Sequence, residues 1–323
     1  GCLFIILDST PTAGLNAVGD TKTYANVFII GFFVNLILDP LFIYGYGPIP
    51  PMGVKGIAYA TIAAEFIATI YVFYRVKKLS NYFDNISLRD FFPTIRYQVD
   101  ILRQALPASL NMFCRGGGFF IIAFFASFFP TPDTSDITIA SYGIAIRIEQ
   151  IILLPAIGLN FACLSLTGQN FGAAKYDRIR EGYLVCLKYG LGLMLIGSVF
   201  LYFGASFFMG IFTDDIKVIT TGAYYLRIAA LFAPILPVLD ISISLLQGVK
   251  KPIYTVYLSL FKDIVGATII FWLLCFYFNY KLEGLWLGIL IINYLSVIIF
   301  LFIVNNRMKS LGLEIFKKKL PSN

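Results

Sequence analysis

The stretch GLWLGILIINYLSVIIFLFIV, residues 284–304, runs for 21 residues without a single charge. About 20 predominantly apolar residues are enough for an α-helix to cross the hydrocarbon core of a bilayer. Lipid cannot bond to backbone N–H and C=O groups, so a continuous apolar crossing of this kind has to be helical. The stretch therefore predicts a transmembrane helix.

The same pattern recurs along almost the whole chain. Further apolar runs cover residues 24–44, 53–74, 104–129, 138–166, 183–212, 218–247 and 253–279, with a partial run at 1–18. The 323 residues are 59% hydrophobic and 13% charged, whereas soluble domains carry about 25% charged residues. The alternating pattern of a membrane barrel strand is absent from the sequence. We predict an all-α integral membrane protein, a polytopic helical bundle with eight full spans and part of another.

Basic residues are distributed unevenly between alternate loops. If successive loops lie on opposite sides of the membrane, one side holds only Lys55, Lys217 and Lys281. The other side holds seventeen, namely Lys22, Arg75, Lys77, Lys78, Arg89, Arg96, Arg103, Lys175, Arg178, Arg180, Lys250, Lys251, Arg307, Lys309, Lys317, Lys318 and Lys319. The positive-inside rule places the larger set in the cytoplasm. The net charge of +7 is thus a topology signal rather than a sign of nucleic-acid binding. We expect a multi-pass protein of the cell inner (plasma) membrane.

The residues that most metal sites and catalytic triads need are missing. The chain has no His, and its five Cys form no C-x-x-C pair. We therefore expect no metal centre and no cofactor apart from a coupling ion, and a membrane enzyme is the weaker hypothesis. The expected partners are the lipid bilayer and a small-molecule substrate, with the protein acting as a monomer.

Similar segments recur at an offset of 228–231 residues. The matching pairs are 15–18 with 246–249, Asn35 with Asp263, and 56–60 with 284–288. Both copies run from cytoplasmic turn to span, outer loop and span, so they form a parallel repeat of the kind found in transporters. Chance similarity of apolar helices is the alternative. The expected domains are the remainder of an N-terminal lobe (1–74), a cytoplasmic linker (75–103), a C-terminal six-helix lobe (104–304) and a basic cytoplasmic tail (305–323).

The segment NLILDP, residues 35–40, is the most specific polar constellation in the spans. Asn35 and Asp39 are four residues apart and share one helix face. Pro40 has no N–H and leaves the carbonyl of Leu36 without its helical donor. These hard oxygen ligands suit Na⁺, although a buried carboxylate could take up a proton instead. Thr61, at a similar depth on the next span, could add a hydroxyl; the alternative is that Asp39 only caps a helix end near the outer surface.

A second group of ionisable residues lies in the later spans, where an ionisable side chain costs roughly 2.5–3.5 kcal/mol at mid-bilayer. Arg115 precedes three glycines in an apolar span and needs a partner, for which Asp240 is the candidate. The two form either a charged site in a cavity or a structural ion pair.

Four more charged residues are candidates for a functional site in the spans. Arg147 and Glu149 share one segment and could pair with neighbours, while Lys262 could extend toward the cytoplasmic interface. Asp263 is a candidate because the repeat aligns it with Asn35.

Several motifs, in this order, resemble the multidrug and toxic compound extrusion (MATE) family. They are GDTKT (19–23), N-x3-DPLFI (35–43), GV-x-G-x-A-x-AT (53–61), LPAS (106–109), RIE (147–149), the loop GQN-x-GA (168–173) and LQG (246–248). The resemblance covers essentially the whole chain, from the end of the family's fourth helix through its twelfth. It implies that roughly the first three helices and part of the fourth are lacking here.

The resemblance implies two six-helix lobes and export of small amphipathic or cationic compounds in exchange for H⁺ or Na⁺. Asn35, Asp39 and Thr61 match positions of a first-lobe cation site, whose first-helix aspartate lies outside this chain. Arg115 stands where some members have a second-lobe acidic residue, and Asp240 lies about one turn from another. A flippase of lipid-linked saccharides and an inactive fragment are the alternatives.

Overall fold

The computed structural model describes residues 2–79, 94–129, 135–310 and 312, and it is helical almost throughout. In the described part the only β pairing is an isolated bridge between Tyr46 and Ile49. Eight helical segments are long and apolar enough to cross a membrane, which confirms the predicted fold class. Residues 80–93 of the predicted linker (75–103) and residues 311 and 313–323 of the predicted tail (305–323) fall outside the described residues.

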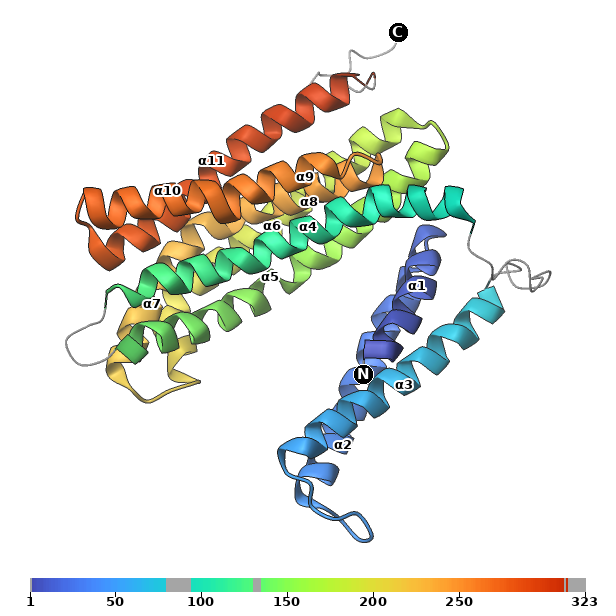
Figure 1. Cartoon of the computed structure of the whole chain (residues 1–323), viewed down its shortest axis with the longest axis horizontal. Coiled ribbons are helices and arrows are strands. Elements are labelled where there is room, and N and C mark those ends of the chain that lie inside the picture. The colour runs from blue at the N-terminus through green and yellow to red at the C-terminus, as the bar shows by residue number, and fades with distance from the viewer. Residues whose placement is uncertain (1, 80–93, 130–134, 311, 313–323) are drawn as a thin grey trace. The chain divides into compact units, whose positions relative to one another are not determined.

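The chain divides into two compact units, residues 1–95 and 96–323, here called unit 1 and unit 2. Unit 1 contains α1 (Cys2–Ala17), α2 (Thr21–Tyr44) and α3 (Val54–Leu79), which lie side by side in Figure 1.

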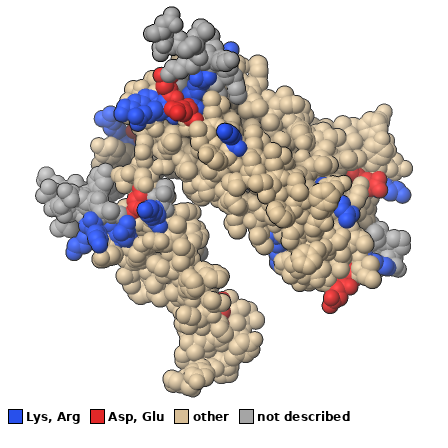
Figure 2. Space-filling view, turned by 180° about the vertical axis from the view of Figure 1, so that it is seen from behind, with Lys and Arg blue, Asp and Glu red and all other residues tan. Residues whose placement is uncertain are grey.

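Unit 2 holds the remaining helices. They are α4 (Ile95–Ser127), α5 (Ser135–Gly172), α6 (Tyr176–Gly210), α7 (Ile216–Phe232), α8 (Leu236–Gly248), α9 (Ile253–Ser259), α10 (Gly266–Trp272) and α11 (Lys281–Ser310). A 3₁₀ turn at Ala233–Ile235 joins α7 to α8 in one span, and π-helical turns at Leu260–Val265 and Leu273–Tyr277 flank α10 in another. Figure 2 shows the charged side chains of unit 2 toward the ends of its helices, with an almost uncharged surface between them.

Asp20 fixes the start of α2 and joins it to the end of α3. Its carboxylate accepts a hydrogen bond from the Thr23 backbone N–H at 3.2 Å and pairs with Arg75 Nη2 at 3.2 Å. Arg75 Nε also donates to Thr23 Oγ1 at 2.9 Å. The carboxylate therefore satisfies an otherwise free N–H of the first helical turn and holds two helices together.

Two glycines that the predicted repeat aligns let a helix begin directly against the end of the preceding one. A Cβ at Gly56 would lie 2.6 Å from the backbone of Phe42, and one at Gly284 would lie 2.8 Å from the backbone of Leu274. Lipid provides little hydrophobic force between helices, so such close backbone approach is a main source of packing energy in membranes. The two hairpins, α2–α3 and α9–α11, thus share a close backbone contact at a glycine as well as a sequence pattern.

The segment GQN-x-GA, expected to be a loop, is instead mostly the last turn of α5, which continues to Gly172. Its amide side chains are satisfied along the helix: Asn170 Nδ2 donates to the Leu166 carbonyl at 2.8 Å, and Gln169 Nε2 donates to Ser165 Oγ at 3.2 Å. The chain leaves the helix only at Ala174, where φ is +53°. Polar side chains bonded one turn back do not end a helix, so the expectation of a loop was wrong.

Candidate functional site

Unit 2 contains a mainly apolar cavity of about 180 Å³ between α4, α5, α7, α8, the first π-helical turn, α10 and α11. Two basic side chains, Arg115 and Lys262, line it together with two acidic ones, Glu149 and Asp263. Most of the remaining wall is aromatic or aliphatic and includes Phe119, Tyr142, Tyr225 and Phe271, and the amides of Gln150 and Asn293 complete it. A mainly apolar pocket with a few converging polar groups is the usual form of a small-molecule site.

Arg115 and Asp240 form the ion pair that the sequence analysis raised as a candidate. Arg115 Nη1 on α4 lies 3.2 Å from Asp240 Oδ1 on α8, and the two side chains are 50% and 20% exposed. Asp240 itself is not part of the cavity lining, whereas Arg115 is. The Arg115 guanidinium therefore lies at the edge of the cavity, with its charge balanced by Asp240.

Lys262 and Asp263 supply the second charge pair. Lys262 Nζ donates to Asp263 Oδ1 at 2.8 Å, and both belong to the π-helical turn Leu260–Val265. Lys262 therefore bonds at the cavity, instead of extending toward the interface as expected. Gly118 on α4 allows the approach, because a Cβ there would lie 3.1 Å from the Asp263 Cβ. Single π-helical turns within α-helices often occur at functional sites.

Glu149 is the most enclosed carboxylate of the cavity, with 8% exposure. Its Oε2 accepts a hydrogen bond of 2.8 Å from the Tyr225 hydroxyl, and Tyr225 packs against Tyr142 and Trp286. Arg147, two residues earlier on α5, is exposed and does not line the cavity. Residues two apart on a helix point in different directions, which explains why these two candidates separate.

In unit 1 the three predicted cation ligands are distributed over α2 and α3. Asn35 and Asp39 lie on α2, and the Oδ1 atom of each is buried and without a hydrogen-bond partner among the described residues. Thr61 on α3 is exposed, and its hydroxyl donates to the Ile57 carbonyl at 2.9 Å. The α2 helix continues through Pro40 to Tyr44.

A second cavity, of about 400 Å³, lies within unit 1 between α1, α2 and α3. Asn35 lines it, while Asp39 and Thr61 do not. Two carboxylates that the sequence analysis did not assign to a site, Asp8 and Glu65, also line it. Their position inside apolar runs is the signal that could have singled them out, because ionisable residues in such runs are rare.

No group of three or more His, Cys, Asp or Glu residues suited to a metal ion occurs within the described parts of the chain. Each of the two cavities is lined by two carboxylates, and basic side chains line only the cavity of unit 2.

Comparison with known proteins places this architecture in a family. The MatE family profile matches residues 107–272. The FAD transporter of Shewanella oneidensis is 26% identical over 273 residues, 80% of this chain and 56% of that protein. A probable multidrug resistance protein of Bacillus subtilis, YpnP, is 26% identical over 289 residues, 89% of this chain and 60% of that protein.

Solved structures agree with these relatives. A crystal structure of a MATE protein in the straight conformation has a TM-score of 0.87 at 25% identity, over 97% of this chain and 68% of that chain. The chain spans somewhat less than two thirds of the length of the curated relatives it matches. With eight apolar membrane-crossing helices and a family match over half of its length, the chain belongs to the MATE family of transporters.

Proposed function

We propose that this protein is a secondary antiporter that exports small amphipathic or cationic compounds while H⁺ or Na⁺ enters the cell. The supporting observation is the pair of unpartnered buried oxygens on α2, Asn35 Oδ1 and Asp39 Oδ1. A buried acceptor without a donor costs roughly 1–3 kcal/mol, more for a charged group. A bound cation or proton at Asp39 removes that cost, so α2 gains stability when the coupling ion is present.

Asn35 and Asp39 are placed so that an ion bound between them contacts α2 directly. They share one face of the helix, and Pro40 leaves the Leu36 carbonyl without its usual donor. An amide oxygen, a carboxylate and a carbonyl are oxygen ligands of the type that hard cations prefer. Exchange follows if the ion and the substrate stabilise different states of the transporter, because a ligand shifts an equilibrium only through its differential affinity.

The cavity of unit 2 is the proposed place for substrate contact. Its aromatic wall suits an amphipathic compound, and Glu149 provides a carboxylate for a cationic one, since Asp263 is already paired with Lys262. The protein is proposed to act as a monomer and to perform no chemical step, with the basic loops, including 75–103 and 305–323, on the cytoplasmic side of the plasma membrane.

Arg115 and Lys262 support a second candidate function. Both line the same cavity, and basic side chains favour an anionic substrate such as the diphosphate of a lipid-linked saccharide. The similarity to a protein named as an FAD transporter, whose substrate carries a diphosphate, points to the same chemistry. In this candidate function the protein is a flippase or exporter of such compounds.

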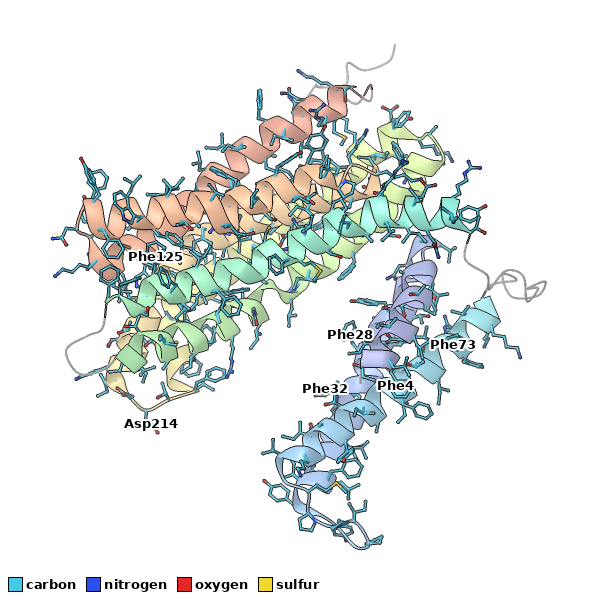
Figure 3. The ribbon with its side chains drawn as sticks, viewed as in Figure 1. Phe4, Phe28, Phe32, Phe73, Phe125 and Asp214 are labelled. Atoms are coloured by element: carbon cyan, nitrogen blue, oxygen red, sulfur yellow. The ribbon has the colours of Figure 1, made fainter. Side chains whose placement is uncertain are left out.

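The test is transport of a cationic dye and of a lipid-linked diphosphate saccharide by the protein reconstituted in liposomes. The proposed antiporter moves the dye, and Asp39→Asn abolishes the movement while leaving the fold intact. Asp214→Asn, which removes an exposed carboxylate in the turn between α6 and α7 (Figure 3), is the matched control and retains transport. Movement of the saccharide but not of the dye would favour the flippase.

A further inference from the structure

A groove of about 460 Å³ lies on the surface of unit 2, along the first turns of α6. The residues that line it all belong to α6, and they are Asp177, Arg180, Glu181, Leu184, Val185 and Lys188. Residues spaced three and four apart share one face of a helix, so these side chains form a single stripe. The groove shares no lining residue with the cavity of unit 2 and is a separate feature of the surface.

The groove faces away from the core of unit 2. The opposite face of α6 is buried and includes Ile179, Gly182, Tyr183, Cys186 and Leu187. Beyond Lys188 the groove face continues with exposed apolar side chains, namely Leu195, Ile196, Val199 and Phe203. Exposed apolar side chains on a membrane-crossing helix contact the acyl chains of lipids. This face of α6 therefore has charges at one end and an apolar stripe after them, which is also the polarity of a phospholipid molecule.

Lys188 is the only charged residue of α6 between Glu181 and the end of the helix at Gly210. It lies inside the apolar run 183–212, about 7.5 Å along the helix axis from the start of that run. Its side chain is exposed and has no ion pair or hydrogen bond with another of the described residues. A lysine at this depth extends its ammonium group toward the head groups of the lipids. Lys188 is therefore placed to meet a lipid phosphate.

Glu181 supplies the opposite charge nearer to the end of the helix. It is exposed and, within the part of the chain that the structure describes, also has no ion pair or hydrogen bond. It lies about 10.5 Å before Lys188 along the helix axis, and extension of the lysine toward that end shortens the separation of the two charges to about one helical turn. Asp177 and Arg180 already interact within the chain, so Glu181 and Lys188 are the charges that remain for a ligand.

We propose that this groove binds phosphatidylethanolamine, a phospholipid whose head group carries a primary ammonium. The lipid phosphate lies next to the hydrocarbon core and accepts from Lys188 Nζ, while the ammonium lies further out and donates to the Glu181 carboxylate. The order of charges along α6 thus matches the order along the head group. Phosphatidylglycerol offers no cation to Glu181, and the choline group of phosphatidylcholine has no N–H to donate. The site lies on the lipid-facing surface and does not depend on the proposed antiport.

The test is native mass spectrometry of the purified protein, titrated with phosphatidylethanolamine, phosphatidylglycerol or phosphatidylcholine of identical acyl chains. The wild type binds phosphatidylethanolamine about threefold to fivefold more tightly than either other lipid, the ratio expected for one exposed ion pair. Lys188→Gln and Glu181→Gln each remove this preference. Lys55→Gln, which removes an exposed lysine of α3, is the matched control and retains it. All three substitutions change exposed side chains, and thermal unfolding checks that each variant is folded.

The double variant Glu181→Lys/Lys188→Glu tests the order of the charges, because it keeps the net charge and reverses the order. We expect it to lose the preference for phosphatidylethanolamine. The proposal is overturned by a wild type that binds phosphatidylethanolamine and phosphatidylcholine equally, by a folded single variant that keeps the preference, or by a reversed variant that binds as the wild type does. Tighter binding of phosphatidylglycerol than of phosphatidylethanolamine would show a site for anionic lipids and also overturns it. Each result is independent of whether the protein transports a dye.

Discussion

Arg115 has its charge balanced within unit 2 by one carboxylate, Asp240, at 3.2 Å. An arginine at membrane depth is costly on its own, and it persists where a partner or water compensates it. The same arrangement recurs at Lys262 and Asp263, so both basic side chains of the cavity enter it already paired. A substrate that uses either cation therefore has to share it with a carboxylate.

The Arg115–Asp240 pair gives a first prediction. Asp240→Asn leaves the guanidinium without a counter-ion, and we expect a loss of roughly 1–3 kcal/mol of stability. This is less than the 3–5 kcal/mol of a fully buried pair because the Arg115 side chain is half exposed. Thermal unfolding of the purified protein measures it as a lower Tm. The double variant Arg115→Gln/Asp240→Asn recovers most of the loss; a double variant as unstable as the single one would show that the charges do not compensate each other.

Asp20 gives a prediction about pH. Burial raises the pKa of Asp20, but hydrogen bonds from Thr23 and Arg75 lower it by more, so the pKa lies below its ordinary value. The unfolded chain therefore binds this proton more readily than the folded one. The contribution to stability is complete above the unfolded pKa of about 3.9 and is lost as the pH falls through the folded pKa.

The measurement for Asp20 is Tm as a function of pH for the wild type and for Asp20→Asn. At neutral pH we expect the variant to be less stable by about 0.5–1 kcal/mol, because Asn caps a helix about as well as Asp and only the ion pair with Arg75 is lost. The difference shrinks as the pH drops below about 4. A difference that does not change with pH would mean that the carboxylate charge contributes nothing to the cap.

At the scale of the element, Gly284 and Gly56 provide a prediction about packing. Gly284→Ala places a methyl group 2.8 Å from the backbone of Leu274, so α11 has to shift, at a cost of roughly 1–3 kcal/mol. Gly192→Ala in α6 is the matched control, because nothing lies within 4 Å of its added methyl and alanine favours a helix. Thermal unfolding compares the two. Equal Tm values would show that the close approach contributes no packing energy.

The helical spans could be predicted from hydropathy because a membrane crossing requires a long apolar run. Their ends could not. The fourth helix begins at Ile95, nine residues before the expected 104, since Arg96, Asp100 and Arg103 continue the helix beyond the apolar run. Likewise α5 continues to Gly172, because Gln169 and Asn170 bond within the helix. Hydropathy predicts which residues lie in the hydrocarbon core of the membrane, whereas the ends of a helix depend on local hydrogen bonds.

At the scale of the whole molecule, the sequence could identify the charged residues of the spans but not which of them meet. Arg115 with Asp240 was raised as a candidate pair and is confirmed as an ion pair. Arg147 and Glu149, neighbours in sequence, separate because one is exposed and the other buried. Asp8 and Glu65 are 57 positions apart, and only the packing of α1 against α3 brings them to one cavity. The assignment of Asn35, Asp39 and Thr61 to ion coupling stays a prediction.

Antiport requires that an ion gradient drives substrate movement. The most direct measurement is cationic-dye transport by the protein in liposomes under a proton gradient and, separately, under a sodium gradient. We expect that at least one gradient drives the dye against its own concentration difference, and that collapsing this gradient with the matching ionophore stops it. Folded, inserted protein that moves no dye under either gradient would show that the protein is not an antiporter of this kind.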